Sequence, residues 1–259
     1  MSFCMIVSPA KKMVVNEGEP AARQEPRFLD EAQELAEELR RLGPAGAQEV
    51  WRCSDRLAEE NWDRVRTLPE DLRLGVSALT AAVSSYRGIQ YTHLAPEVMD
   101  GAQLSWLSRH LRIVSGLYGL LRPFDAIAPY RLEMQARLSV GGSKSLYEFW
   151  DSRIYDALAC ERGITHIVNV ASQEYAKAVL PWALPDGPKI VTCSFMIPRA
   201  KDGRLTQPST EAKAARGSFV RWAAERQVED VQELKGFAER GYAFSPERSG
   251  EKAWSFVRA

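Results

Sequence analysis

Short, continuously apolar runs, separated by longer amphipathic stretches, are the feature that most restricts the fold of this 259-residue chain. Residues 3–7, 165–171 and 189–197 are rich in β-prone apolar side chains. A run of this length and composition predicts a buried strand. Ser8 and Pro9 close the first run, and Ser172 follows the second, so each strand leads into a polar loop or helix start.

The stretches between these runs carry apolar residues at helical spacing. In residues 28–42, for example, Leu29, Ala32, Leu35 and Leu39 fall on one helix face, and a Gly-Pro pair follows. The same spacing predicts helices at 55–66, 72–84, 145–161, 172–179 and 210–226. A strand and a loop are predicted for 112–123, and the alternating residues at 242–256 predict a closing hairpin.

Helices and strands therefore interleave, although without the regular spacing of a doubly wound sheet. No internal repeat or linker divides the chain. We expect one mixed α/β (α+β) domain over residues 1–259, with a central sheet and many helices.

Composition excludes several classes of protein. Lys and Arg number 34 and Asp and Glu number 34, so the net charge is zero, which excludes polycationic binding of nucleic acid. No apolar run is long enough to cross a bilayer and no leader pattern begins the chain, so we expect a cytoplasmic protein without a membrane partner. The four cysteines lie far apart, which predicts buried thiols and no disulfide framework.

The zero net charge hides a local imbalance. Residues 104–216 contain 15 Lys and Arg against 10 Asp and Glu, a net charge of +5, and the flanks balance it. Arg predominates among the basic residues, and its planar guanidinium suits phosphate or carboxylate groups. A localised anion site is therefore compatible with the composition.

The motif Ser8-Pro-Ala-Lys11 directly follows the first predicted strand. Sheets of α/β proteins bind ligands at the carboxyl ends of their strands, where such a turn would lie. Lys11 would then be an anion clamp, or an amine nucleophile if burial lowers its pKa. The alternative is an exposed turn lysine.

A second group of polar residues lies in residues 115–134, which also contain two glycines and two prolines. If this segment is a site, Arg122 and Arg131 bind an anion, and Glu133 is a general base or orients Lys11. The alternative is structural, with ion pairs of Arg122 with Asp125 and of Arg131 with Glu133. The residues alone favour neither interpretation.

Two further motifs are weaker. Asn169 and Ser172 stand where a strand ends and a helix begins, with Lys177 on that helix. An ordinary helix cap and a surface residue would explain them. Lys213 and Arg216 share one face of the 210–226 helix, where Gly217 would allow close approach of a backbone or a ligand, although a solvated basic face is the commoner case.

No cofactor or metal site is predicted. The three histidines have no metal-ligand spacing, and the sequence has no P-loop, G-x-G-x-x-G, H-E-x-x-H or G-x-S-x-G motif.

Taken together, the motifs resemble the peroxide stress protein YaaA family over essentially the whole chain. The resemblance rests on these segments in this order: Ser8-Pro-Ala-Lys11, Ser54-Asp-Arg-Leu-Ala58, Arg112-Ile-Val-Ser-Gly-Leu-Tyr-Gly-Leu-Leu-Arg-Pro123, Pro129-Tyr-Arg-Leu-Glu-Met134, Leu146-Tyr-Glu-Phe-Trp150, Asn169-Val-Ala-Ser172 with Glu174-Tyr175, Lys213 with Ala215-Arg-Gly217, and Gly241-Tyr242. It implies an α/β domain of unusual topology in a cytosolic bacterial protein.

The resemblance further implies protection from hydrogen peroxide by limiting free iron, and DNA binding through a positive cleft and a helix-hairpin-helix-like element. Here that element would be the end of the 210–226 helix with residues 228–237. The sequence departs from the family pattern at Ile89 and Gln173, where acidic residues are usual, at Arg87, which replaces a lysine, and at Glu211, within a run that has lost an aromatic-basic pair. These changes predict a divergent member.

Two functions remain open at this stage. The first is a binding protein that holds DNA or another phosphate-bearing ligand. The second is an enzyme acting on a small anionic or nucleobase-like substrate, in which Lys11, Glu133 and Tyr130 are the catalytic groups. The residues predicted to hold the anion are Arg87, Arg122, Arg131, Asn169, Ser172, Lys177, Lys213 and Arg216. The sequence does not predict the oligomeric state.

Overall fold

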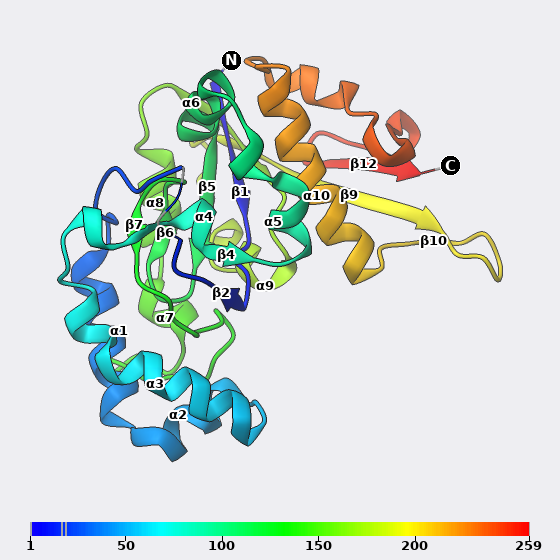
Figure 1. The fold of residues 1–259 in the computed structure, drawn as a ribbon. Coiled ribbons are helices and arrows are strands. Elements are labelled where there is room, and N and C mark those ends of the chain that lie inside the picture. Colours follow the sequence, from blue (N-terminus) through cyan, green and yellow to red (C-terminus); the bar gives the residue numbers. More distant parts are fainter. Residues whose placement is uncertain (1, 17, 19, 259) are drawn as a thin grey trace.

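The computed structural model describes residues 2–16, 18 and 20–258. Its centre is an eight-stranded mixed sheet with the order β11-β12-β9-β8-β1-β5-β6, to which β10 is joined through β9 (Figure 1). The five strands from β12 to β5 run parallel, and the edge strands β6 and β11 run antiparallel to their neighbours. The strands of this sheet are β1 (Ser2–Val7), β5 (Leu111–Ser115), β6 (Gly119–Leu121), β8 (Ile164–Asn169), β9 (Lys189–Pro198), β10 (Leu205–Thr206), β11 (Tyr242–Phe244) and β12 (Ala253–Arg258).

Two small ribbons lie outside the main sheet. Strand β2 (Lys12–Met13) pairs with β4 (Tyr86–Arg87), and β3 (Thr80–Ala81) pairs with β7 (Ala126–Ile127), both antiparallel.

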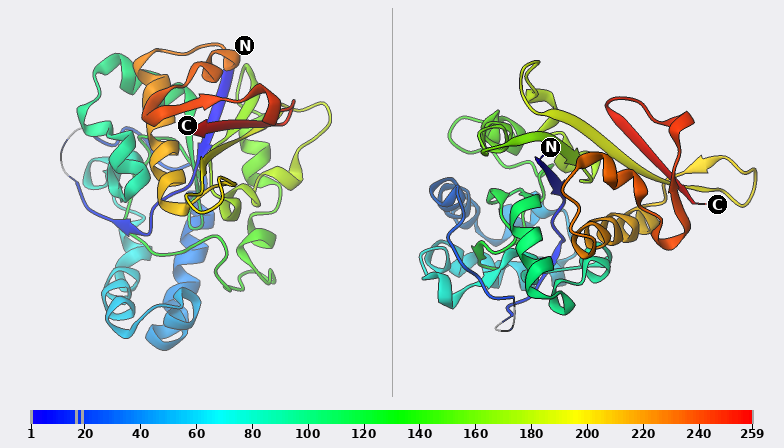
Figure 2. Two further views of the ribbon diagram at one scale, coloured as in Figure 1. Left: turned by 90° about the vertical axis from the view of Figure 1, so that its right-hand side faces the viewer. Right: turned by 90° about the horizontal axis from the view of Figure 1, so that it is seen from above.

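Helices pack around the sheet, and α1–α3 form a separate layer at the end of the molecule away from β12 (Figures 1 and 2). One continuous hydrophobic core joins residues of these helices to residues of the sheet. The helices are α1 (Leu29–Arg41), α2 (Gly43–Trp51), α3 (Asp55–Asp71), α4 (Ala82–Ser85), α5 (Ile89–Leu94), α6 (Gly101–His110), α7 (Leu146–Trp150), α8 (Arg153–Ala159), α9 (Gln173–Ala176) and α10 (Ser209–Glu225).

The order of the strands creates a point where the chain changes direction across the sheet. From β1 the next strand of the main sheet is β5, on one side, whereas from β8 the next strand is β9, on the other side. Strands β1 and β8 are adjacent and parallel. Their carboxyl ends therefore flank the crevice in which open α/β sheets bind ligands.

The structure confirms the mixed α/β fold with a central sheet. The predicted strands at 3–7, 165–171 and 189–197 correspond to β1, β8 and β9, and the predicted closing hairpin corresponds to β11 and β12. Helix α1 buries Ala32, Leu35, Ala36 and Leu39, as its spacing predicts. No described helix combines the length and the apolar character needed to cross a membrane.

Two helix predictions are wrong. Residues 72–84 do not form a helix, because Thr80 and Ala81 pair with β7 instead and only α4 follows. The stretch 145–161 is two helices, α7 and α8, broken at Asp151, whose φ is +47°. Just before the break, the buried Trp150 donates its indole N–H to the carbonyl oxygen of Gly116 at 2.9 Å. Two short helices therefore take the place of the single helix that the spacing predicts.

Three smaller predictions also change. Helix α1 ends at Arg41, just before the Gly-Pro pair as predicted, but a further helix, α2, begins directly at Gly43. Helix α3 extends beyond residue 66 to Asp71. Only Cys4 and Cys193 are buried, whereas Cys53 is half-buried and Cys160 is exposed.

The predicted hairpin-like element consists of α10 followed by a 3-10 helix, Val231–Gly236, which folds back on it. Phe237 packs on Phe219 and Trp222 of α10, with ring centroids 5.1 Å and 5.7 Å apart. The connection is held to α6 by a hydrogen bond from the Trp106 indole to Val228.

Candidate functional site

A cleft of about 390 Å³ opens at the carboxyl ends of β1 and β8. Its walls come from the loop after β1, from β4 and α5, from α9 and from α10, which Figure 1 shows around the lower end of β1. The charged residues that line it are Lys11, Lys12, Arg87, Lys213 and Arg216, together with Glu133 and Glu174.

Ser8 joins three of these walls. Its hydroxyl accepts a hydrogen bond from the backbone N–H of Ser172 at 2.8 Å and donates to the Ser172 hydroxyl at 3.2 Å. Its carbonyl oxygen accepts from the side chains of Gln90 and Tyr91, both at 3.0 Å. Ser172 stands at the helix cap position of α9, as predicted, but its side chain makes no capping hydrogen bond.

Glu133 is held at the cleft by a close approach of two backbone segments. A Cβ added at Gly116 would lie 2.3 Å from the carbonyl oxygen of Leu132, so this position requires glycine. The Gly116 segment follows β5, and it thereby fixes the segment that carries Glu133.

Glu133 joins two of the predicted site residues. Its Oε1 lies 3.2 Å from Lys11 Nζ and 3.2 Å from a terminal nitrogen of Arg131. The side chain of Lys11 is 67% exposed, whereas those of Glu133 and Arg131 are 11% and 12% exposed. Lys11 therefore lacks the burial that a nucleophilic lysine would need, and its position suits an anion clamp.

Glu174 is a second carboxylate in the same cleft. Burial raises its pKa, and the neighbouring Glu133 raises it further, while a hydrogen bond from the backbone N–H of Gln135 and the charge of Lys11 act in the opposite direction. The two carboxylates thus have different surroundings, since Glu133 contacts two cations and Glu174 is partly desolvated.

Arg216 lines the opposite wall. Its Nε is buried, and within the described ranges it has no hydrogen-bond partner. Burial also lowers the pKa of the guanidinium. No carboxylate of the described residues lies within ion-pair distance of Arg216, so its charge faces the cleft without an acidic partner.

The small β2–β4 ribbon brings two more cations to the cleft. Lys12 and Arg87 are directly opposite each other in this antiparallel pair. Arg87 is a predicted anion-binding residue, whereas Lys12 was not predicted. Sequence spacing does not reveal this pairing, because the two residues lie 75 positions apart in the chain.

Tyr130 lies beneath the cleft. Its hydroxyl is 2.6 Å from the Ser115 hydroxyl and 2.9 Å from that of Tyr86, in a buried network. Burial raises the pKa of Tyr130 to about 12. It borders a small hollow beside Lys11 and Glu133, so the structure brings it near the other two predicted catalytic residues without exposing it in the main cleft.

Four predicted anion-binding residues do not line the cleft. Arg131 borders the small hollow next to it and reaches the cleft only through its ion pair with Glu133. Arg122 lies at a separate hollow, where it is 3.7 Å from Asp125 and bonds Gln24. Lys177 is exposed and stacks over Tyr147, with its Nζ 4.7 Å from the ring centroid. Asn169 is buried and holds the end of β8 through hydrogen bonds to Thr192 and to the backbone of residue 171.

The two ion pairs of the structural alternative are therefore both present, Arg122 with Asp125 and Arg131 with Glu133. Glu133 of the second pair also lines the cleft, so the two interpretations are compatible there.

The structure also corrects the origin of the positive charge. Only Lys213 and Arg216 of the basic lining residues come from the segment 104–216, whereas Lys11, Lys12 and Arg87 come from before it. Among the described residues, no group of three or more His, Cys, Asp or Glu side chains is placed to hold a metal ion.

Comparison with known proteins adds the family. A sequence model described as peroxide stress protein YaaA matches residues 3–248. The chain belongs to the peroxide stress protein YaaA family. Similar proteins include UPF0246 proteins of Lactiplantibacillus plantarum, 43% identical over 255 residues and 98% of each chain, and of Limosilactobacillus fermentum, 44% identical over 256 residues, 98% of this chain and 99% of the other. A UPF0246 protein of Lachnoclostridium phytofermentans is 38% identical over 254 residues, 98% of this chain and 96% of the other.

Several YaaA motifs quoted above meet at the cleft, namely those that contain Lys11, Glu133, Ser172 and Arg216. The departures from the family pattern have different surroundings. Ile89 lines the cleft and is partly exposed, and Gln173 begins α9. Glu211 lies 3.2 Å from Arg240 and 2.9 Å from Arg258, so it ties α10 to the end of the chain.

Proposed function

We propose that the cleft at the ends of β1 and β8 binds a small phosphate-bearing ligand, and that this binding underlies the role of the protein in peroxide stress. The observation that carries the proposal is the charge of Arg216, which has no acidic partner among the described residues. A partly buried guanidinium without a carboxylate partner costs free energy unless an anion binds it. Arg is also the side chain best suited to phosphate, because it can donate two parallel hydrogen bonds.

The size and the other lining residues support a small ligand. A volume of about 390 Å³ falls within the usual range of small-molecule sites. Four further cations, Lys11, Lys12, Arg87 and Lys213, face two carboxylates, so the lining carries a net positive charge. Ser8 and Ser172 add hydroxyl groups at its floor.

Calorimetric titration tests this proposal with inorganic phosphate, with AMP and with duplex DNA, each at low and at physiological salt. We expect Arg216→Gln to weaken phosphate and AMP binding at least about tenfold, the usual loss of a charged hydrogen bond. Arg221→Gln is the matched control, since Arg221 lies on the same helix but is paired with Glu225 at 2.7 Å. Equal affinities of the two variants would overturn the proposal.

The DNA arm tests the nucleic-acid function that the resemblance implies. Binding of duplex DNA through several phosphates would weaken steeply with salt, by roughly 0.9 log units per log unit of salt for each contact. The connection of the hairpin-like element, residues 226–230, contains Arg226 against Glu229 and Asp230, so it carries no net positive charge. We therefore expect AMP to bind more tightly than a duplex at physiological salt.

A growth assay tests the link to stress and to iron. A strain that lacks the gene should be sensitised to hydrogen peroxide, and the wild-type gene should restore growth. If ligand binding in the cleft is needed to limit iron damage, the Arg216→Gln gene should fail to restore it while Arg221→Gln succeeds.

The pair of carboxylates favours a second candidate, an enzyme acting on a small anionic or nucleoside-like substrate. Glu133, kept beside Lys11 and Arg131, would serve as general base, and Glu174 as its proton-donating counterpart. Mononucleotides incubated with the protein would be followed by phosphorus and proton NMR. Product formation that Glu133→Gln abolishes, at an unchanged melting temperature, would favour the enzyme, and unchanged spectra for wild type would exclude it for this substrate class.

A further inference from the structure

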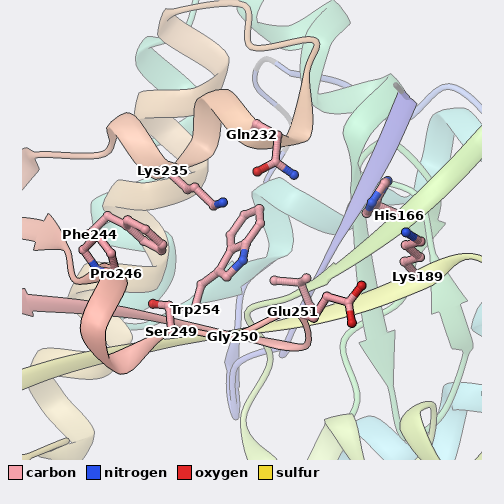
Figure 3. Close-up of a pocket in the computed structure, with 11 residues that line it drawn as sticks. His166, Lys189, Gln232, Lys235, Phe244, Pro246, Ser249, Gly250, Glu251 and Trp254 are labelled. Carbon is pink, nitrogen blue, oxygen red and sulfur yellow. The ribbon is translucent and has the colours of Figure 1, made fainter.

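A second cavity, of about 470 Å³, lies at the other end of the parallel strands, where β8 and β9 begin (Figure 3). None of its lining residues lines the cleft described above. Its volume also falls within the usual range of small-molecule sites.

The floor of this cavity follows from the register of three strands. His166 of β8 pairs with Lys189, the first residue of β9, so the two side chains are neighbours on one face. Val191 lies two residues further along β9 on the same face. Trp254 of β12 pairs with Cys193, the next residue of β9 on that face, and continues the floor with a side chain that is 96% buried within the fold.

The opposite wall comes from the chain after α10. The 3-10 helix Val231–Gly236 supplies Gln232 and Lys235, and β11 supplies Phe244. Figure 3 shows these side chains around the same cavity as Trp254, His166 and Lys189.

Lys235 is held in place by aromatic rings and not by an acid. Its Nζ lies 5.0 Å from the ring centroid of Trp254 and 5.2 Å from that of Phe244. In the part of the chain that the structure describes, no carboxylate lies within ion-pair distance of Lys235 or of Lys189. Glu251 is the single acidic residue among those described as lining the cavity.

We infer that this cavity is a second binding site, which takes a planar organic anion, an aromatic group that carries a carboxylate or a phosphate. Lys235 and Lys189 supply unpaired positive charge, Trp254, Val191 and Pro246 supply apolar surface, and Gln232 supplies an amide for hydrogen bonding. The faces of the two aromatic rings attract the ammonium group of Lys235 and keep it at the cavity. The site is independent of the cleft and of the function proposed for it.

The test observes Trp254 directly. In protein labelled with 5-fluorotryptophan, Trp254→Phe identifies the fluorine resonance of this residue. The probes are AMP and benzoate, which combine a ring with a charge, and adenosine and inorganic phosphate, which each lack one of the two. The titrations use the Arg216→Gln protein, so that ligand in the cleft does not contribute.

We expect AMP or benzoate to shift the Trp254 resonance in a saturable way, and adenosine and phosphate to bind at least about tenfold more weakly. The stronger of the first two probes tells whether the natural ligand is a phosphate or a carboxylate. Lys235→Met should weaken the binding about tenfold or more and Lys189→Met should weaken it as well, while Lys201→Met, at an exposed lysine of the β9–β10 connection, should leave it unchanged.

Three results would overturn the inference. They are the absence of any shift with AMP and benzoate, unchanged affinity in both the Lys235→Met and the Lys189→Met proteins, and binding of phosphate as tight as that of AMP. Two lysine variants are used so that unfolding of one leaves the test valid, and melting temperatures show which of them is folded.

Discussion

Gly217 of α10 packs directly against the backbone of Gln90 in α5. A Cβ added at position 217 would lie 2.0 Å from the carbonyl oxygen of Gln90 and 2.9 Å from the Cβ of His93. The close approach that the sequence suggested at Gly217 is therefore to a second helix and not to a ligand. Gln90 and Arg216 both line the cleft, so this contact sets the separation of two of its walls.

Gly217→Ala should destabilise the fold by about 3 kcal/mol, because the new methyl group meets backbone atoms that can move only with the whole helix. It should also weaken phosphate binding, since the walls that carry Gln90 and Arg216 would separate. Chemical denaturation and calorimetry measure the two effects. Gly101→Ala is the control, because a Cβ at Gly101 meets nothing within 4 Å, and equal stability of the two variants would contradict the contact.

Ser8→Ala should be more harmful than Ser172→Ala. The first change removes the acceptor of the Ser172 backbone N–H, and a buried donor left without a partner costs about 1 to 3 kcal/mol. The second change removes a hydroxyl that makes no capping hydrogen bond. Urea denaturation of both variants gives the comparison, and a larger loss for Ser172→Ala would show that the junction is held differently.

Asp125 should make the protein less stable as the pH rises. Burial raises its pKa from 3.8 to about 6, so the folded state holds this proton more tightly than the unfolded state. Its stabilising contribution is complete below the unfolded pKa and is lost as the pH rises through the folded pKa, a change of about 3 kcal/mol for a shift of this size.

The free energy of unfolding of wild type minus that of Asp125→Asn should therefore fall between about pH 4 and pH 6. Asp202 is the control of opposite sign, because the hydrogen bond from Arg199 lowers its pKa. For Asp202→Asn the corresponding difference should rise with pH. A flat difference for Asp125→Asn would show that this carboxyl group is not shifted by burial.

Arg112 should be important for stability. Its guanidinium makes two hydrogen bonds to Glu161, of 2.7 Å and 2.6 Å, and two more to the carbonyl oxygens of Ser108 and Leu111. Arg112→Met keeps the apolar stem but leaves these acceptors unpaired, and should cost about 3 kcal/mol. Thermal and urea denaturation measure the loss, with the exposed Arg221→Gln as the control, for which we expect less than about 1 kcal/mol.

Sequence periodicity predicted those elements whose patterns are local. The apolar face of α1 and the β-prone runs of β1, β8 and β9 are visible in consecutive residues, because each of these elements buries a regular set of its own side chains. Thr80 shows where this reasoning fails. Its stretch has a helical pattern, but pairing with Ile127 decides its structure.

The candidate site was predicted in part for a similar reason. Lys11 and Ser172 follow buried strands, and the carboxyl ends of neighbouring parallel strands meet at one edge of a sheet. Lys12 and Glu174 belong to the same segments, but nothing in their spacing shows that they face the cleft. Arg122 belongs to the motif of residues 115–134, yet it lies at a separate hollow, 3.7 Å from Asp125.

The sequence by itself determined the family, the mixed α/β class and the segments that hold the polar motifs, because these depend on residue identity and on local spacing. Only the tertiary structure decided which charges remain unpaired. Arg131 and Arg216 both belong to motifs that the chain shares with the YaaA family, but the first contacts Glu133 and the second has no acidic partner among the described residues. The same holds for Lys235, whose aromatic partners come from two different strands. Whether a charge is neutralised depends on which distant segments pack beside it, and a one-dimensional pattern does not contain that information.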